Sequence, residues 1–205
     1  MKQEQQREHL QLKADLIGNY LIDKTCDAHK QLGIFYAPSG GNVHKVARLI
    51  KQKLINFTPD LFVISDVQPS ILLDYQNLIL VSSTLGRNTW EMEQRDPWPS
   101  FLSQLQRLQL QGRKVAIVSL GDHVSYANNF VDGMGILADI VERIGGELIG
   151  ETSTVDYVFN DSRALRDGKF VGLPLDEDYE SERTEARIDQ WLDKILFHLL
   201  NSTRS

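Results

Sequence analysis

The sequence predicts an α/β domain in which helices cover both faces of a doubly wound, five-stranded parallel sheet. Five apolar runs of strand length alternate with segments whose apolar residues recur at helical spacing. Continuously apolar runs are typical of parallel strands that are buried on both faces. Polar or glycine-containing loops follow the first, third and fourth runs. Sheets of this type bind ligands at the carboxyl ends of their strands, so these loops are the first places to look for a site.

The first strand is expected at residues 32–36, where a short apolar run ends in a cluster of breakers at residues 37–41. Asn42 then stands where a helix N-cap should be, and apolar residues follow it at helical spacing as far as residue 54. A turn at residues 56–60, which contains proline, closes this helix.

The remaining elements follow from the same patterns. Apolar runs predict strands at residues 61–65, 77–82, 114–119 and 147–150, with a short helical segment at 71–74. Helices are expected at residues 98–108, 130–144 and 182–200. Prolines near the start of the first, a glycine pair after the second and the core spacing of the third support these assignments.

Composition limits the classes of function. The 205 residues carry a net charge of −6, which argues against nucleic-acid binding because that function needs a basic face. Cys26 is the single cysteine, so an internal disulfide and a cysteine-based metal cluster are excluded, and no metal site is expected. The sequence shows neither a membrane span nor a secretory signal. We expect a cytoplasmic protein.

The chain divides into an extension at residues 1–31 and a domain at residues 32–200. In the extension, Leu10, Ile17 and Leu21 recur at helical spacing and predict an extra helix that lies on the domain, or a frayed tail. A contact with a partner or a second copy of the chain is the alternative. We expect a monomer, with dimerisation through the extension as the other possibility.

The loop after the first strand has the form of an anion site. The candidate residues are Ser39, Gly40, Gly41, Asn42 and Val43, which connect a strand to the start of a helix. Unpaired backbone N–H groups and the positive end of the helix dipole converge at such a point, where a phosphate binds well. The alternative is an ordinary turn whose glycines serve backbone geometry alone.

Four stretches of the chain resemble the flavodoxin family, specifically its long-chain branch. Residues 162–178 are similar to the insertion that splits the fifth strand of those proteins, and residues 187–192 to their last helix. Residues 120–122 and 126–130 are similar to their flavin-contacting loop after the fourth strand. The resemblance covers residues 32–199. It implies a flavodoxin-like fold in three layers with an interrupted fifth strand, a bound FMN, and one-electron transfer without catalytic residues.

The resemblance assigns roles to residues after the fourth strand. Tyr126 matches the aromatic residue that stacks on the isoalloxazine ring, where an apolar cover disfavours the anionic reduced flavin. Asp122 matches an acidic residue beside the ring, and Leu120 and Gly121 lie where the backbone approaches the pyrimidine edge. Asn129 is expected to cap the following helix rather than to contact flavin.

The loop after the third strand departs from the family pattern. Ser83, Thr84, Leu85 and Gly86 are its candidate flavin contacts, with Thr84 matching a threonine near the ribityl chain. Leu85 replaces a tryptophan on the inner face of the ring, which would widen access to the flavin. Trp90 lies in a lengthened part of this loop. It has three alternative roles: covering the ring, facing a partner or packing locally.

The phosphate loop has lost hydroxyl groups that the family carries. Pro38, Gly40 and Val43 stand at the three hydroxyl positions, which leaves Ser39 as the loop's hydroxyl. Each lost hydrogen bond to a phosphate is worth roughly 1.5–3 kcal/mol, so FMN affinity should fall below the family's level. His44 or Lys45 would compensate if either faced the phosphate. The alternative for both is a solvated first turn, which we favour.

The leading hypothesis is an FMN-dependent electron carrier. Its partners would be a flavodoxin/ferredoxin-type NADP reductase and electron-accepting enzymes. Acidic residues that could dock a basic partner, or simply form a solvated face, are Asp176, Glu177, Asp178, Glu180 and Glu182.

Two alternatives remain from the sequence. The chain could be a binding or regulatory module that has lost or weakened its FMN binding, as the altered phosphate loop suggests. It could also be a flavin-dependent quinone-type reductase with a substrate pocket under residues 83–96. His123 is a weak catalytic candidate for that reaction, because the sequence shows no nucleophile–base arrangement around it.

Overall fold

The computed structural model describes residues 30–83 and 96–200, and its centre is a parallel sheet in the order β2-β1-β3-β4-β5. The strands are β1 (Lys30–Tyr36), β2 (Asp60–Val63), β3 (Tyr75–Ser82), β4 (Lys114–Leu120), β5 (Glu147–Ile149) and β9 (Leu173–Leu175). The first strand, β1, pairs with β2 on one side. The chain then crosses to the other side of β1, where β3, β4 and β5 follow in order. The winding direction therefore reverses between β1 and β3, which is where such sheets open a crevice for a ligand.

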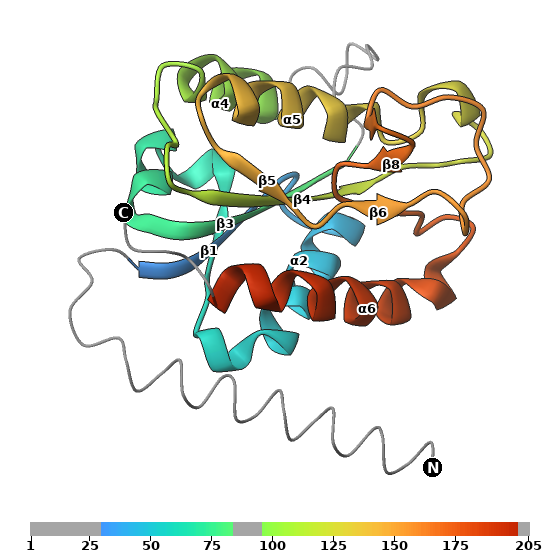
Figure 1. Ribbon diagram of the computed structural model, residues 1–205, viewed down its shortest axis with the longest axis horizontal. Coiled ribbons are helices and arrows are strands. Elements are labelled where there is room, and N and C mark those ends of the chain that lie inside the picture. Colours follow the sequence, from blue (N-terminus) through green and yellow to red (C-terminus); the bar gives the residue numbers. More distant parts are fainter. Residues whose placement is uncertain (1–29, 84–95, 201–205) are drawn as a thin grey trace.

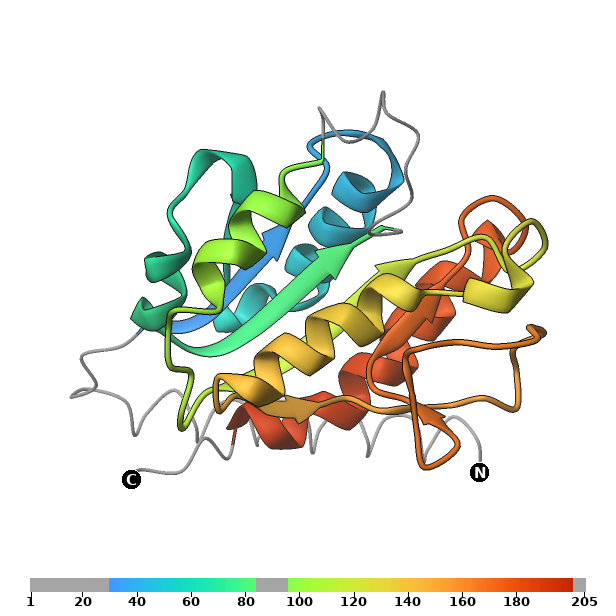
Figure 2. The ribbon, with the colours of Figure 1, turned by 90° about the horizontal axis from the view of Figure 1, so that it is seen from above.

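Helices cover both faces of the sheet, as predicted. They are α2 (Gly41–Lys53), α4 (Trp98–Leu105), α5 (Asp132–Arg143) and α6 (Ser181–Leu200). Figure 1 shows α4 and α5 on one face and α2 and α6 on the other, and Figure 2 shows the same layers from above. Short 3₁₀ turns η1 (Ile55–Phe57), η2 (Ile64–Asp66), η3 (Pro69–Asp74) and η4 (Ala127–Asn129) complete the connections. The sheet and its two helical layers confirm the predicted fold class.

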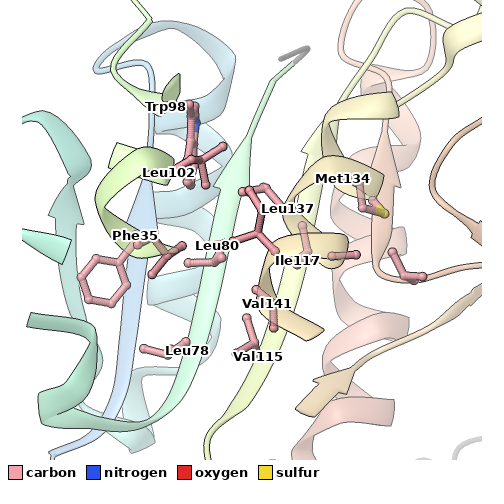
Figure 3. Close-up of a cluster of buried hydrophobic side chains, with 14 of the residues drawn as sticks. Phe35, Leu78, Leu80, Trp98, Leu102, Val115, Ile117, Met134, Leu137 and Val141 are labelled. Carbon is pink, nitrogen blue, oxygen red and sulfur yellow. The ribbon is translucent and has the colours of Figure 1, made fainter. Parts of the chain in front are cut away.

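The central strands β1, β3 and β4 contribute to two separate cores, because their side chains alternate between the faces of the sheet. Leu80 and Ile117 are neighbours on adjacent strands and point toward α4 and α5, where Leu102 and Leu137 meet them (Figure 3). The next residues along the strands face α2 and α6 and form the second core. This double burial explains why the strand sequences are continuously apolar.

The fifth strand position is split, as the resemblance implied. The first half of β4 pairs with β5, and its second half pairs with β9. Between them, β6 (Thr152–Ser153), β7 (Leu165–Arg166) and β8 (Lys169–Phe170) form a small antiparallel sheet in the order β6-β8-β7. The chain returns to the main sheet at Gly172, where an added Cβ would lie 2.2 Å from the carbonyl oxygen of Ile117. Glycine is therefore required where β9 joins the sheet.

Several helices and strands begin or end at residues other than those predicted. β2 ends at Val63 because residues 64–66 tighten into a 3₁₀ turn. α5 begins at Asp132 rather than at residue 130, because Val131 adopts the left-handed conformation with φ of 49°. α4 ends at Leu105 and not at residue 108. The predicted extension, including Cys26, lies outside the described residues except for the start of β1.

Residues 30–83 and 96–200 contain neither a membrane-spanning helix nor a cluster of metal ligands. In these ranges, no helix combines the length and the apolarity that a membrane crossing requires. The same ranges contain no group of three or more histidine, cysteine, aspartate or glutamate side chains placed to hold a metal ion.

Candidate functional site

A cavity of about 300 Å³ lies where β1, β3 and β4 end. The loop after β1, the end of β3 and the loop after β4 all contribute to its wall, as the sequence predicted. At the ends of β3 and β4, the side chain of Ser82 donates a hydrogen bond to that of Ser119 at 3.2 Å, and both residues are buried. This bond links the paired ends of β3 and β4. The cavity therefore rests on the rigid carboxyl edge of the sheet.

Two glycines shape the first wall. Gly40 is the N-cap of α2 with φ of 91°, and Gly41 is the first helical residue with φ of 61°. A Cβ added to either glycine would meet no atom within 4 Å, so both border open space. The sequence predicted Asn42 as the N-cap, but the N-cap is Gly40 and the helix begins at Gly41. Asn42 lies inside the first helical turn, and its Oδ1 accepts a hydrogen bond from Lys45 Nζ at 3.3 Å.

The N-terminus of α2 is suited to an anion. Among the described residues, no side chain caps this terminus and no acidic residue occupies its first turn. Backbone N–H groups of the first turn thus remain for a ligand, and the helix dipole favours a negative charge there. Gly40, Gly41, Asn42 and Val43 all line the cavity. Pro38, which was not among the sequence candidates, also lines it.

The remaining candidates of the phosphate loop lie outside the cavity wall. Ser39 is exposed on the loop, but it is not among the lining residues. The ring of His44 stacks on that of Tyr36 with centroids 5.2 Å apart, and Lys45 is exposed. Neither His44 nor Lys45 lines the cavity. Lys45 is thus solvated, as we favoured from the sequence, whereas His44 is half-buried against Tyr36.

The loop after β4 forms the second wall, with Leu120, Gly121, Asp122 and Tyr126 at the cavity. Oδ1 of Asp122 accepts hydrogen bonds from the N–H groups of Val124 and Ser125 at 2.9 and 2.6 Å. The carboxylate therefore closes its own loop. The Tyr126 N–H in turn donates to the carbonyl of Asp122 at 3.1 Å, and its side chain remains 42% exposed. Tyr126 is thus partly exposed where it lines the cavity.

Two residues of this loop make structural contacts that the sequence did not predict. A Cβ on Gly121 would lie 3.0–3.2 Å from Val131 and Phe130, so glycine allows the loop to sit close to the start of α5. Asn129 does not cap α5, because the N-cap is Val131. Asn129 instead donates a hydrogen bond from Nδ2 to Oδ2 of Asp132 at 2.9 Å.

The third wall comes from the chain after β9, which the sequence indicated only as an acidic surface. Glu177 and Asp178 line the cavity, but Asp176 is completely buried, so its assignment to an exposed acidic patch is wrong. Burial would raise the pKa of Asp176, yet hydrogen bonds from the backbone N–H groups of His123 and Tyr179 outweigh it. The pKa therefore lies below its ordinary value, and the carboxylate is ionised at neutral pH.

The loop after β3 is described only at its two ends. Ser83 lines the cavity, whereas Thr84, Leu85, Gly86 and Trp90 lie outside the described residues. At the far end of the loop, Trp98 is buried and donates a hydrogen bond from its indole N–H to the carbonyl of Ala37 at 3.3 Å. This bond ties α4 to the start of the phosphate loop. The sequence predicted a helix that starts at Trp98, but it did not predict this hydrogen bond.

Known proteins match this chain over the same residues. The family model described as flavodoxin matches residues 34–191. The flavodoxin of a Nostoc species is 39% identical over 167 residues, which cover 81% of this chain and 95% of that relative. The flavodoxin of a Synechocystis species is 37% identical over 80% of this chain and 95% of its own length. The crystal structure of Fusobacterium nucleatum flavodoxin bound to flavin mononucleotide superposes with a TM-score of 0.73 at 29% identity, covering 82% of this chain and 97% of that one. This chain therefore belongs to the flavodoxin family.

Proposed function

We propose that this chain binds FMN in the cavity at the carboxyl edge of the sheet and carries electrons between redox partners. The observation that supports this most directly is the cavity itself, where an uncapped helix N-terminus and an exposed tyrosine border the same space. Family membership supports it as well, since the Fusobacterium flavodoxin holds flavin mononucleotide. When bound, FMN supplies one-electron chemistry that no side chain offers.

The residues present fit the phosphate end of FMN. Gly40 and Gly41 leave open space, so a phosphate can approach the N–H groups of the first turn of α2. These groups and the dipole replace hydroxyls that Pro38 and Val43 cannot supply. The absent hydroxyls lower the affinity by roughly 1.5–3 kcal/mol each, relative to a loop that carries them.

Another part of the cavity wall suits a flat aromatic ring. Tyr126 presents its ring on the wall formed by the loop after β4. A stacked tyrosine excludes water and holds the ring by dispersion and quadrupole contacts. Asp122, Glu177 and Asp178 place negative charge around the same space, which opposes the addition of an electron nearby.

The partners follow from the charge of the site. Glu177 and Asp178 line the cavity in a chain of net charge −6. A basic flavodoxin/ferredoxin-type NADP reductase would be attracted there, and so would basic electron-accepting enzymes. We propose that the chain works in the cytoplasm as a monomer, with residues 1–31 as an extension outside the flavin-binding domain.

The experiment is a titration of the purified full-length chain with FMN, followed by absorbance and flavin fluorescence. We expect saturable binding at one site, with the fluorescence quenched by Tyr126. The loaded protein should then accept electrons from NADPH only when an NADP reductase is added. A chain that takes up no FMN at millimolar concentration would overturn the proposal. Oxidation of NADPH by the chain alone, with a quinone as acceptor, would overturn the carrier role.

A further inference from the structure

Asp176 holds together two walls of the cavity that come from distant parts of the chain. Its carboxylate is completely buried just after β9. Oδ1 accepts hydrogen bonds from the N–H groups of Asp178 and Tyr179, both at 2.9 Å. Oδ2 accepts hydrogen bonds from the backbone N–H of His123 at 2.9 Å and from its ring Nδ1 at 2.5 Å. Both oxygens are therefore used, and each binds a different wall.

The side chain of His123 is fixed by these contacts. An ionised carboxylate can only accept, so Nδ1 of His123 carries the proton and donates. The imidazole also meets the rings of Phe130 and Tyr179 edge to face, with centroids 6.2 and 5.9 Å apart. Phe130 lies between η4 and α5, two residues before the helix begins, and Tyr179 lies in the turn that Asp176 closes. The imidazole thus fills the joint between the two loops.

Four of the residues that line the cavity lie close in sequence to this joint. On one side, Asp122 and Tyr126 flank His123 in the loop after β4. On the other side, Glu177 and Asp178 follow Asp176. A change at the joint must therefore move side chains that line the cavity.

We infer that His123 is a positioning residue that, clamped by Asp176, sets the Tyr126 wall of the cavity against the Glu177–Asp178 wall. The inference rests on the proposed function, because the walls matter for a ligand in that cavity. His123 does not line the cavity, so it acts through the backbone of its loop. The Nδ1–H bond is the component that a substitution can remove while the backbone bond stays.

The chain allows the hydrogen bond and the ring packing to be separated. His123→Phe keeps a ring beside Phe130 and Tyr179 but removes the donor. His123→Asn removes the ring but places an amide nitrogen at the same number of bonds from Cβ as Nδ1. His198→Phe is the matched control, because His198 is an exposed residue of α6 that does not line this cavity.

The first measurement is hydrogen–deuterium exchange on the flavin-free protein, which reports on the joint whether or not FMN binds. We expect exchange in residues 121–130 and 176–180 to quicken by about tenfold in His123→Phe, which corresponds to about 1.4 kcal/mol. His123→Asn and His198→Phe should exchange like the unsubstituted chain. Residues 41–53 should be unaffected in all variants.

The second measurement is FMN affinity, together with the visible circular dichroism of the bound flavin. His123→Phe should bind about tenfold more weakly and give a changed flavin spectrum, and His123→Asn should remain within about threefold. Unchanged exchange and affinity in His123→Phe would overturn the inference. His123→Asn behaving like His123→Phe would overturn it as well, because the ring and not the donor would then hold the joint. If the unsubstituted chain binds no FMN, the proposed function fails. The exchange data would still show whether the hydrogen bond from His123 holds the two loops together.

Discussion

At Gly41 the backbone enters α2 with φ of 61°, in a region that side chains with a Cβ rarely adopt. A Cβ there would touch nothing, so substitution carries a conformational cost and no clash. Gly41→Ala should lower the free energy of unfolding by about 1 kcal/mol. It should also weaken FMN binding, because the first N–H groups of the helix would turn away from the cavity. Urea denaturation and FMN titration measure the two effects.

Gly168 provides the control for this prediction. It has φ of 77°, also with open space where a Cβ would stand, but it lies in the insertion and not in the cavity wall. Gly168→Ala should lose a similar amount of stability and keep the FMN affinity. Equal loss of affinity in both variants would contradict a specific role for the phosphate loop.

The carboxylate of Asp176 should govern part of the acid stability. Its pKa is held below the ordinary value, so it stabilises the fold above the pKa of the unfolded chain and loses this effect as pH falls through the folded pKa. Asp176→Asn should cost about 3 kcal/mol at pH 7, because an amide nitrogen would face N–H donors. The difference between the two proteins should shrink below about pH 4. Urea denaturation from pH 7 to pH 3 measures it, and a constant difference would contradict the assignment.

The sequence could predict the lining residues better than the residues that hold them. Gly121, Asp122 and Tyr126 stand in a recognisable loop directly after a strand, so a local pattern was sufficient. The bond between His123 and Asp176 joins positions 53 residues apart, and no local pattern encodes it. Three consecutive acidic residues are normally solvated, and only the return of β9 to the sheet buries the first of them.

At the scale of elements, the insertion is fastened to α6 through Arg187. Its Nη2 donates to the carbonyl of Asp156 at 3.1 Å, and its guanidinium lies 4.3 Å from the ring centre of Tyr157. Its Nη1 lies 2.7 Å from Oε2 of Glu180. Burial raises the pKa of Tyr157 to about 12, so the phenol stays neutral and donates to the carbonyl of Pro174. The insertion is therefore bound to both the helix and β9.

Arg187→Ala should release this fastening. We expect a loss of about 2 kcal/mol in stability and faster hydrogen exchange in residues 154–160, because a cation–π contact and a nearly buried ion pair disappear together. Arg183→Ala is the control on the same helix. Arg183 pairs with Glu180 while half exposed, and such pairs contribute less than about 1 kcal/mol. Equal effects in the two variants would contradict the fastening role.

Element positions were predicted correctly, while their ends were governed by single backbone angles. Asn42 has the chemistry of an N-cap, yet the positive φ angles of the two preceding glycines start the helix two residues earlier, with Gly40 as the N-cap. A single backbone angle also sets the start of α5, which begins later than predicted because Val131 adopts the left-handed conformation. A β-branched residue rarely adopts that conformation, so no sequence pattern predicts this delay.

At the scale of the whole molecule, the alternation of strands and helices was enough to predict the sheet and its layers. The strand order was not predicted, and the structure gives it as β2-β1-β3-β4-β5. The cavity between the ends of β1, β3 and β4 is a consequence of that order. Its third wall was not predictable, because the length of the insertion hides which residues come back to the sheet.

The charge of the molecule predicts how it meets its partners. Electron transfer to a basic reductase should slow several-fold between 20 and 500 mM salt, because salt screens the attraction to the negative face. Asp178→Asn should lower the rate at low salt, whereas Glu142→Gln on the exposed side of α5 should not. Stopped-flow kinetics with one reductase measure both. A rate that does not depend on salt would contradict electrostatic docking.

The flanks of the sheet are short: β2 has four residues and β5 has three, before β9 takes over beside β4. A neighbouring molecule could add a β-strand only to a longer row of unpaired N–H and C=O groups. Splitting the fifth strand thus removes a template for polymer growth. Concentrated solutions of the folded chain are expected to stay free of thioflavin-binding fibrils, even though every strand in the centre is rich in apolar residues.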